Sequence, residues 1–182
     1  MEEKLKKSGL NKDLEKLLTD KSQPESYHID KITDKVYLGD IDDASQYDYF
    51  SNENITHVLS IINNFNINLS DNNKITHKLL KLDDEENANL IKYFKECIEF
   101  IENSGKIFVH CLAGISRSPT IVISYLMWKA KVSFYDAYFF VKSRRPFISP
   151  NPGFERQLKI FGDLLEKNNY DLNKIDFEKI QI

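Results

Sequence analysis

Residues 106–130 read KIFVHCLAGISRSPTIVISYLMWKA, and this stretch decides how the rest of the sequence is interpreted. The segment KIFVHC (106–111) is apolar throughout its centre, which predicts a strand buried on both faces. The segment SPTIVISYLMWKA (118–130) is apolar almost all round, which predicts a buried central helix. Pro119 suits its first turn, where the missing N–H has no intrahelical partner. A loop that joins a buried strand to a buried helix is a recurrent ligand site in α/β folds.

Strands and helices alternate on both sides of this stretch, from Ile29 onward. Apolar and β-branched runs predict strands, and 3.6-residue periodicity predicts helices. The predicted strands are 35–40, 55–62, 75–82 and 106–111, and the predicted helices are 42–50 (capped by Asp42 or Asp43), 87–102, 118–130, 133–145 and 151–167. Strands separated by helices indicate an α/β fold in which helices flank a sheet.

The length of 182 residues indicates one domain with one sizeable core. Residues 1–27 are set apart as a leader: Leu14, Leu17 and Leu18 share a helical face, and Pro24 marks a linker. We therefore divide the chain into the leader, a main domain over 28–168 and a C-terminal tail over 169–182.

The composition excludes several classes of protein. The chain is 41% hydrophobic and 29% charged, its net charge is −3 and its mean hydropathy is −0.46. This charge provides no basic footprint for nucleic acid, and no apolar run reaches the roughly 20 residues that cross a bilayer. The start, MEEKLKKSGL, has neither the apolar centre of a signal peptide nor a myristoylation site, and the end, KIQI, has no prenylation site. We expect a cytoplasmic or nuclear protein without a membrane partner.

The cysteines and histidines do not form a metal-binding or disulfide pattern. Cys97 and Cys111 have no CxxC partners and are expected to be reduced thiols. The histidines are scattered and lack zinc-ligand spacing: His28, His57, His77 and His110. No metal or cofactor is predicted.

The loop between the predicted strand and helix has the properties of an anion cradle with a nucleophile. Free N–H groups and the helix dipole at its end favour an anion, and Ala113 and Gly114 let the backbone approach it closely. Arg117 can add a bidentate fork to a tetrahedral oxyanion. The same charges favour a thiolate at Cys111, which could attack a bound phosphate, while Ser118 could hydrogen-bond the sulfur as it leaves.

The stretch HCLAGISRS resembles the HCxxGxxRS signature of the cysteine-based protein phosphatases. The similarity to their small dual-specificity branch extends from Ile32 to Leu165 through VYLGD, ITHVLSI, AGISRSPTIVISYLM and VKSRRPFISPNPGFERQL. The resemblance implies the protein tyrosine phosphatase-like fold, with a mixed, mostly parallel sheet, and a metal-independent phosphatase acting through a cysteinyl-phosphate. It implies phosphate binding by the loop residues Leu112, Ala113, Gly114, Ile115, Ser116 and Arg117, supported by His110 and Asn151.

The family uses an aspartate as general acid, on a loop before the helix that precedes the cysteine strand. Here KLDDEENANL (81–90) provides that loop. The resemblance favours Asp84, which lies six residues before Leu90, and Asp83 is the alternative. The separation of 27 residues between Asp84 and Cys111 is a few shorter than is common in the family.

Simpler structural roles exist for each of these residues. Cys111 could be a core residue, Ser118 a helix cap, the acidic run at 83–86 a helix start, and Arg144 and Arg145 a solvated face. Arg144 and Arg145 could instead touch a second substrate phosphate.

Three functions follow from the sequence. The leading one is dephosphorylation of phosphotyrosine, phosphoserine and phosphothreonine in a protein substrate, a kinase being one candidate. The alternatives are a phosphatase for phosphoinositides or RNA 5′-triphosphates, and an inactive phospho-binding scaffold. The neutral side chains of the loop disfavour a highly anionic substrate. The sequence does not specify the oligomeric state.

Overall fold

The computed structural model describes residues 29–63 and 75–182. Its five-stranded sheet has the order β1-β2-β5-β3-β4. The strands are β1 (Asp30–Lys31), β2 (Val36–Gly39), β3 (Ile55–Ile61), β4 (Thr76–Leu80) and β5 (Lys106–His110). Only β1 is antiparallel to its neighbour, so the prediction of a mixed, mostly parallel sheet is confirmed. The predicted leader and most of the loop after β3 lie outside the described residues.

The central strand β5 sets the place of the site. It pairs with β2 and β3 in parallel, and Val109 lies between Leu38 and Leu59 in register. Side chains alternate across the strand, so Phe108 packs in one core cluster, and Ile107 and Val109 pack in the other. Because the strands are parallel, the segments that follow β2, β5, β3 and β4 all leave at the same edge of the sheet.

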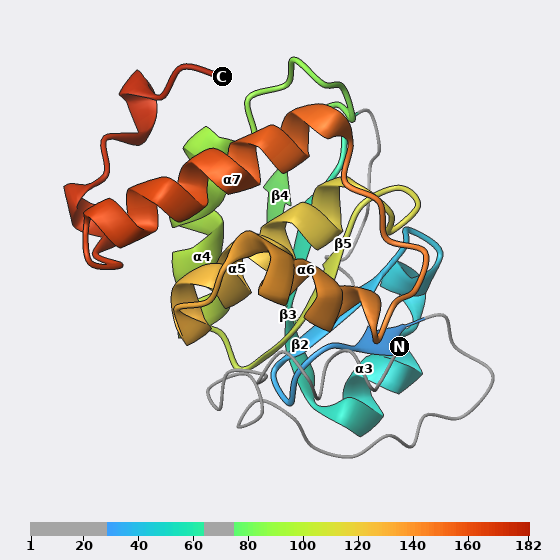
Figure 1. Cartoon of the computed structure of the whole chain (residues 1–182). Helices are drawn as coiled ribbons and strands as arrows, with labels where there is room; N and C mark the ends of the chain where they lie inside the picture. Colours follow the sequence, from blue (N-terminus) through green and yellow to red (C-terminus); the bar gives the residue numbers. More distant parts are fainter. Residues whose placement is uncertain (1–28, 64–74) are drawn as a thin grey trace.

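Helices cover both faces of this sheet (Figure 1). The larger core cluster lies beneath four helices, and the smaller one beneath a fifth. The four are α4 (Phe94–Asn103), α5 (Arg117–Ala130), α6 (Phe134–Lys142) and α7 (Pro152–Lys167), and the fifth is α3 (Tyr47–Glu53). The predicted buried helix is confirmed as α5, which is buried on almost every side.

Two predicted helices differ in detail from the structure. The segment 42–50 divides into the 3-10 helix η1 (Asp43–Ser45) and α3, and the side chain of Asp42 makes no capping bond. Instead, Asp40 Oδ1 accepts the backbone N–H groups of Asp42 and Asp43 at 3.0 and 3.1 Å. The segment 87–102 becomes helical only at Ile91, with η2 (Ile91–Tyr93) leading into α4.

The C-terminal tail packs on the main core. It contains η3 (Leu172–Lys174) and η4 (Phe177–Lys179). Leu172, Ile175 and Phe177 are buried in the larger cluster, and Phe177 lies 6.2 Å from Phe161 of α7 between ring centroids.

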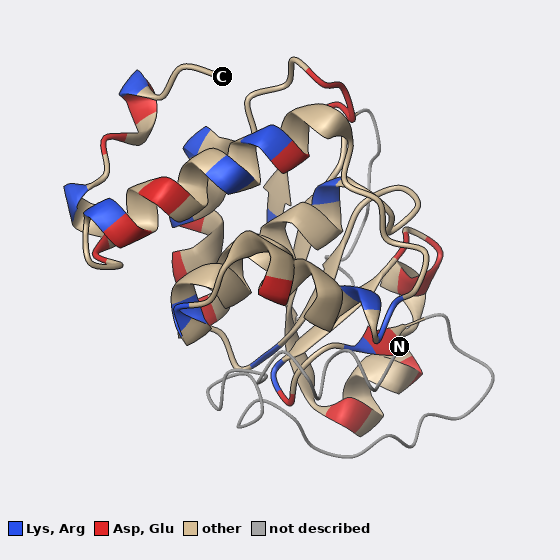
Figure 2. Cartoon of the chain, in the orientation of Figure 1, with Lys and Arg blue, Asp and Glu red and all other residues tan. Residues whose placement is uncertain are grey.

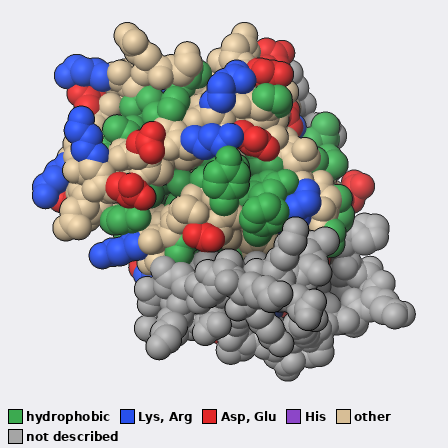
Figure 3. All heavy atoms as spheres, viewed as in Figure 1, with side chains coloured by type: hydrophobic (Ala, Val, Ile, Leu, Met, Phe, Trp, Pro, Cys, Tyr) green, Lys and Arg blue, Asp and Glu red, His purple; other side chains and the backbone are tan. Residues whose placement is uncertain are grey.

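Hydrophobic side chains also gather on the surface over α6 (Figure 3). Tyr135 and Phe139 are 58% and 52% exposed there. Within residues 29–63 and 75–182, no helix combines the length and the apolarity needed to cross a membrane.

Candidate active site

Cys111 follows β5 directly and lies at the bottom of the phosphate loop, as we call residues 111–117. The side chain is buried, with 1% of the residue exposed. Ser118, in the first turn of α5, donates its hydroxyl proton to Cys111 Sγ over 3.2 Å. The sulfur therefore sits between the end of a strand and the start of a buried helix, where the helix dipole favours negative charge.

The backbone of the phosphate loop is held from outside by two segments, one after β2 and one between α6 and α7. The carbonyl of Leu112 accepts the N–H of Ile41 at 3.2 Å, and the carbonyl of Ile115 accepts the N–H of Ser149 at 2.8 Å. The Gly114 carbonyl accepts Nε of Arg145 at 2.9 Å. In a trans peptide the N–H points opposite to the C=O, so these bonds turn the amides of the next residues toward the inside of the loop. Such inward amides form an anion-binding concavity.

Gly114 is required by this packing. It adopts φ of +64°, and a Cβ at this position would overlap the Gly39 carbonyl and the Arg145 guanidinium. Only glycine meets both conditions without strain.

Arg117, the first residue of α5, provides a buried donor for the loop. Its NH1 donates to the Leu82 carbonyl at 3.0 Å, and the side chain is 8% exposed. Among the described residues, Arg117 Nε is the only buried side-chain nitrogen or oxygen without a hydrogen-bond partner. Buried polar groups are nearly always hydrogen-bonded, so a guanidinium N–H without such a partner, in the same loop as Cys111, indicates a site for an anionic ligand.

The two candidate acids lie in different surroundings. Asp84 Oδ1 accepts the Ser116 hydroxyl at 2.6 Å and the Asn151 amide at 2.9 Å, and Asp84 Oδ2 lies 3.6 Å from Arg117 Nε. Both carboxylate oxygens of Asp83 instead accept from Asn63 Nδ2 at 2.9 Å. The fold thus brings Asp84 against the phosphate loop, with a third of its side chain (33%) exposed.

Asn151 connects Asp84, the phosphate loop and α7. Its Oδ1 caps α7 by accepting the N–H of Phe154 at 2.9 Å, while its Nδ2 binds Asp84. Its own backbone N–H donates to Ser116 Oγ at 3.1 Å. The side chain that caps this helix therefore also orients the carboxylate.

His110 forms a buried hydrogen-bonded chain behind the cysteine. Its Nδ1 lies 3.2 Å from the Cys111 carbonyl and its Nε2 lies 2.6 Å from Ser60 Oγ, which lies 2.8 Å from His77 Nε2. Burial lowers the pKa of His110 to about 4, with a smaller contribution from His77, so the ring is neutral near pH 7. A carbonyl only accepts, so Nδ1 carries the proton and Nε2 accepts the Ser60 hydroxyl. Sequence reasoning missed Ser60, whose only signal was a polar residue inside an apolar strand.

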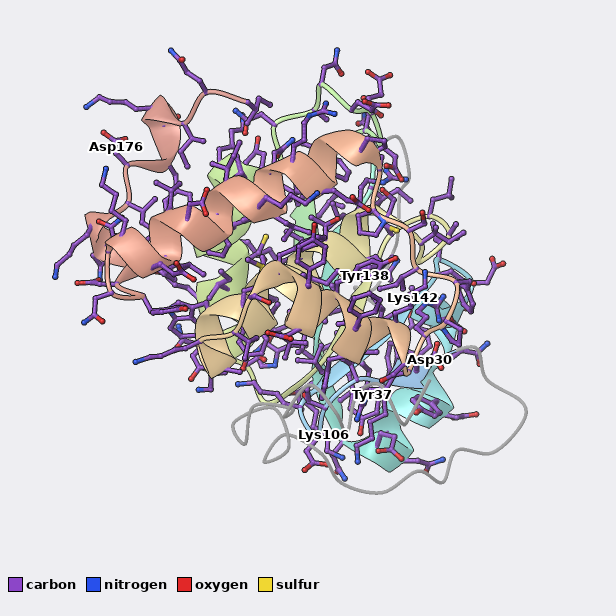
Figure 4. The ribbon with its side chains drawn as sticks, in the orientation of Figure 1. Asp30, Tyr37, Lys106, Tyr138, Lys142 and Asp176 are labelled. Carbon is purple, nitrogen blue, oxygen red and sulfur yellow. The ribbon has the colours of Figure 1, made fainter. Side chains whose placement is uncertain are left out.

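The expectation of a solvated arginine pair is wrong for Arg145, which is 1% exposed. Its Nε donates to the Gly114 carbonyl, and its NH1 donates to Asp30 Oδ2 of β1 at 2.7 Å. Figure 4 shows Asp30 beside the segment that follows α6. Arg144 is partly buried against the Phe140 ring, at 3.9 Å from its centroid. Arg145 is thus an internal brace for the phosphate loop.

The acidic residues near the site gather on two loops that flank the phosphate loop (Figure 2). One is the acid loop, as we call residues 81–90, with four consecutive acidic residues at 83–86. The other follows β2 and contains Asp40, Asp42 and Asp43. Burial raises the pKa of Asp43 to about 6, opposed by a hydrogen bond from the Asp40 backbone and by the charge of Arg145, while the Asp40 carboxylate adds to the increase. Within the described ranges, no group of three or more His, Cys, Asp or Glu side chains could hold a metal ion.

Cys97 has none of the surroundings of Cys111. It lies in α4, packs in the larger core cluster and is fully buried. Burial raises the pKa of its thiol to about 12, so it is an unreactive core residue at neutral pH. Both cysteines are free.

Comparison with known proteins agrees with this geometry. Residues 36–163 match the family model described as dual specificity phosphatase, catalytic domain. The chain belongs to this family. It is 40% identical over 137 residues to dual specificity protein phosphatase 22-A of Danio rerio, and 39% identical over 136 residues to dual specificity protein phosphatase 15 of Mus musculus. These matches cover 73% and 72% of this chain but 64% and 57% of the relatives, so this chain spans less than two thirds of either.

Solved structures of the family have the same fold. The crystal structure of DUSP15 is 36% identical, with a TM-score of 0.72 over 78% of this chain and 92% of that one. A second similar structure is that of the human tyrosine phosphatase-like serine/threonine/tyrosine-interacting protein, which is 30% identical with a TM-score of 0.72 over 76% of this chain and 97% of that one. These likenesses confirm the expected phosphatase-type fold.

Proposed function

We propose that this protein dephosphorylates phosphotyrosine and phosphoserine or phosphothreonine in protein substrates through a cysteinyl-phosphate intermediate. The observation that carries the proposal is the buried Nε of Arg117, which has no hydrogen-bond partner and belongs to the same loop as the hydrogen-bonded thiol of Cys111. Membership of the dual specificity phosphatase family supports the substrate class.

In the first step, the Cys111 thiolate attacks phosphorus and the bond from phosphorus to the leaving oxygen breaks. The guanidinium of Arg117 and the inward amides of the phosphate loop bind the equatorial oxygens, where charge develops. Asp84, in its protonated form, gives its proton to the leaving oxygen. These groups supply the charge stabilisation and proton transfer that the step needs.

In the second step, Asp84 removes a proton from water, which attacks the phosphorus of the cysteinyl-phosphate. The P–S bond breaks, inorganic phosphate forms and the thiolate returns. The Ser118 hydroxyl, 3.2 Å from the sulfur, stabilises the leaving thiolate. Asp84 is then protonated again for the next cycle.

The two alternatives are less well supported. A phosphoinositide or RNA 5′-triphosphate carries several charges, and acidic loops flank the phosphate loop on both sides, which disfavours such substrates. A binding-only scaffold would need neither a nucleophile nor a proton donor, yet the phosphate loop contains Cys111, whose sulfur accepts a hydrogen bond from Ser118, and its Ser116 binds Asp84.

Hydrolysis of 4-nitrophenyl phosphate, followed by peptides with phosphotyrosine, phosphothreonine and phosphoserine, tests the proposal. We expect turnover of the aryl phosphate and of the phosphopeptides that survives EDTA and is blocked by orthovanadate. Activity that requires an added metal would overturn the mechanism. Activity on a phosphoinositide with none on the peptides would overturn the substrate class. Our prediction for the substrate remains a phosphorylated protein, such as a kinase, and our prediction for the compartment remains the cytoplasm or nucleus.

A further inference from the structure

The first two turns of α7 lie next to the acid loop (Figure 1). Gln157 is buried, with 1% exposed, and its side chain makes three hydrogen bonds to the backbone of residues 88–91, at the end of the acid loop. Its Oε1 accepts the N–H groups of Leu90 and Ile91 at 2.9 and 2.8 Å, and its Nε2 donates to the Ala88 carbonyl at 2.8 Å. The N–H of Leu90 also donates to the Ala88 carbonyl at 3.1 Å, and Ile91 begins η2, where its N–H has no partner within the helix. Loss of Gln157 would remove its three bonds to this backbone.

Gly153 allows α7 to approach the acid loop closely. A Cβ at this position would overlap the carbonyl of Glu86, two residues after Asp84. Because the obstacle is backbone and not the end of a flexible side chain, a larger residue would have to move the loop. Arg156, at the exposed surface, adds an ion pair to Glu86 at 3.5 Å.

We propose that Gln157 and Gly153 are positioning residues that fix the acid loop on α7 and so hold Asp84 in place for proton transfer. The inference rests on the proposed function, because it gives the loop a catalytic purpose. Neither residue touches the phosphate loop in a described contact; both act through the backbone that follows Asp84, at Glu86 and at residues 88–91.

If Gln157 and Gly153 position Asp84, their loss should affect substrates according to the pKa of the leaving group. A leaving group of low pKa departs without a proton, whereas a phenol with a pKa of about 10, like that of tyrosine, needs one. Displacing Asp84 should therefore slow phenyl phosphate and leave 4-nitrophenyl phosphate largely unchanged. General destabilisation would slow both substrates alike.

The first experiment compares Gly153→Ala with Gly162→Ala, the same substitution in the same helix. At Gly162 a Cβ would meet only the flexible end of Met127, at 3.3 Å. We expect Gly153→Ala to lower kcat/KM for phenyl phosphate about tenfold or more, to change that for 4-nitrophenyl phosphate less than about threefold, and Gly162→Ala to change neither. Equal losses on both substrates in Gly153→Ala would overturn the proposal.

The second experiment places Gln157→Ala in the wild type and in an Asp84→Ala background. If Gln157 acts through Asp84, its substitution should selectively slow phenyl phosphate in the wild type and have no further selective effect when Asp84 is absent. Additive effects would contradict the proposal. Leu165→Ala, a buried α7 residue, controls for lost stability. Wild-type protein inactive on both aryl phosphates would refute the proposed function, whereas an active wild type with unselective variants would refute only the positioning role.

Discussion

The phosphate loop and the acid loop face each other across the site but are held in opposite ways. The phosphate loop is fixed by three bonds to its own carbonyls from two parts of the chain, Ile41 after β2 and Arg145 and Ser149 between α6 and α7. The acid loop is exposed from Asp83 to Asn87, and its backbone after Asp84 is held by one helix, α7. The difference indicates that the anion cradle is rigid, while the position of the acid depends on a few contacts that can be changed singly.

The largest effect on activity is expected from Cys111→Ser. This variant tests whether the phosphate loop binds an anion independently of the nucleophile. A hydroxyl is far less ionised than a thiol at neutral pH, so turnover should fall at least about 1,000-fold. Because the backbone bonds of the loop remain, tungstate should still bind, as measured by calorimetry. A variant that loses tungstate binding in proportion to activity would show that the cradle is not independently rigid.

Asp84→Ala should have the next largest effect on activity, and it tests whether Asp84 is the general acid. We expect about a 100-fold loss of kcat/KM for phosphotyrosyl peptides, a much smaller loss for 4-nitrophenyl phosphate, and a flattened limb of the pH–rate profile. Asp83→Ala is the matched control, because its carboxylate binds Asn63 and not the phosphate loop. If Asp83→Ala gave the selective loss instead, the assignment would be wrong by one residue.

Arg145→Lys should weaken anion binding by the phosphate loop, because Arg145 holds the loop in place. Lysine cannot bind the Gly114 carbonyl and Asp30 in the same fork, so we expect tungstate affinity and kcat to fall together, about tenfold. The adjacent Arg144→Lys serves as the control, since Arg144 packs on Phe140 outside the loop. Wild-type tungstate affinity in Arg145→Lys, with a preserved fold, would show that the loop does not need this brace.

The smallest effect is on stability and concerns the histidine behind the phosphate loop. The pKa of His110 is about 4 in the folded protein and near 6.5 in an unfolded chain, so the unfolded state binds the proton first as pH falls. The free energy of unfolding should therefore decrease by about 1–3 kcal/mol between pH 6.5 and pH 4. Urea unfolding across this range should show a weaker pH dependence in His110→Asn than in the wild type. An identical dependence in both proteins would contradict the buried, neutral assignment.

The same contrast between the loops explains what the sequence could and could not predict. The phosphate loop is contiguous, so Cys111, Gly114 and Arg117 could be recognised together with the strand and helix that flank them. Asp83 and Asp84 are neighbours in the chain, and only the fold, through Ser116 and Asn151, distinguishes them. The sequence therefore located the candidate acid only to within one residue.

The residues that hold the two loops in place were harder to predict than the candidate catalytic residues. Arg145 precedes a proline in a basic pair and looked solvated, because its partner Asp30 lies 115 residues away. The strand β1 has two residues and no pattern of its own, so it was not predicted. Gln157 looked like an ordinary polar residue of an amphipathic helix, since the backbone groups that it binds lie 66 to 69 residues away.

The most direct test of the central claim is to trap the phosphorylated enzyme. Wild-type protein mixed with a phosphotyrosyl peptide and quenched within the first turnover should carry one phosphoryl group, and peptide mapping should place it on Cys111. Under the same conditions Cys111→Ser should carry none. A rapidly hydrolysing wild type with no phosphoryl group on Cys111, or with one on another residue, would contradict the account.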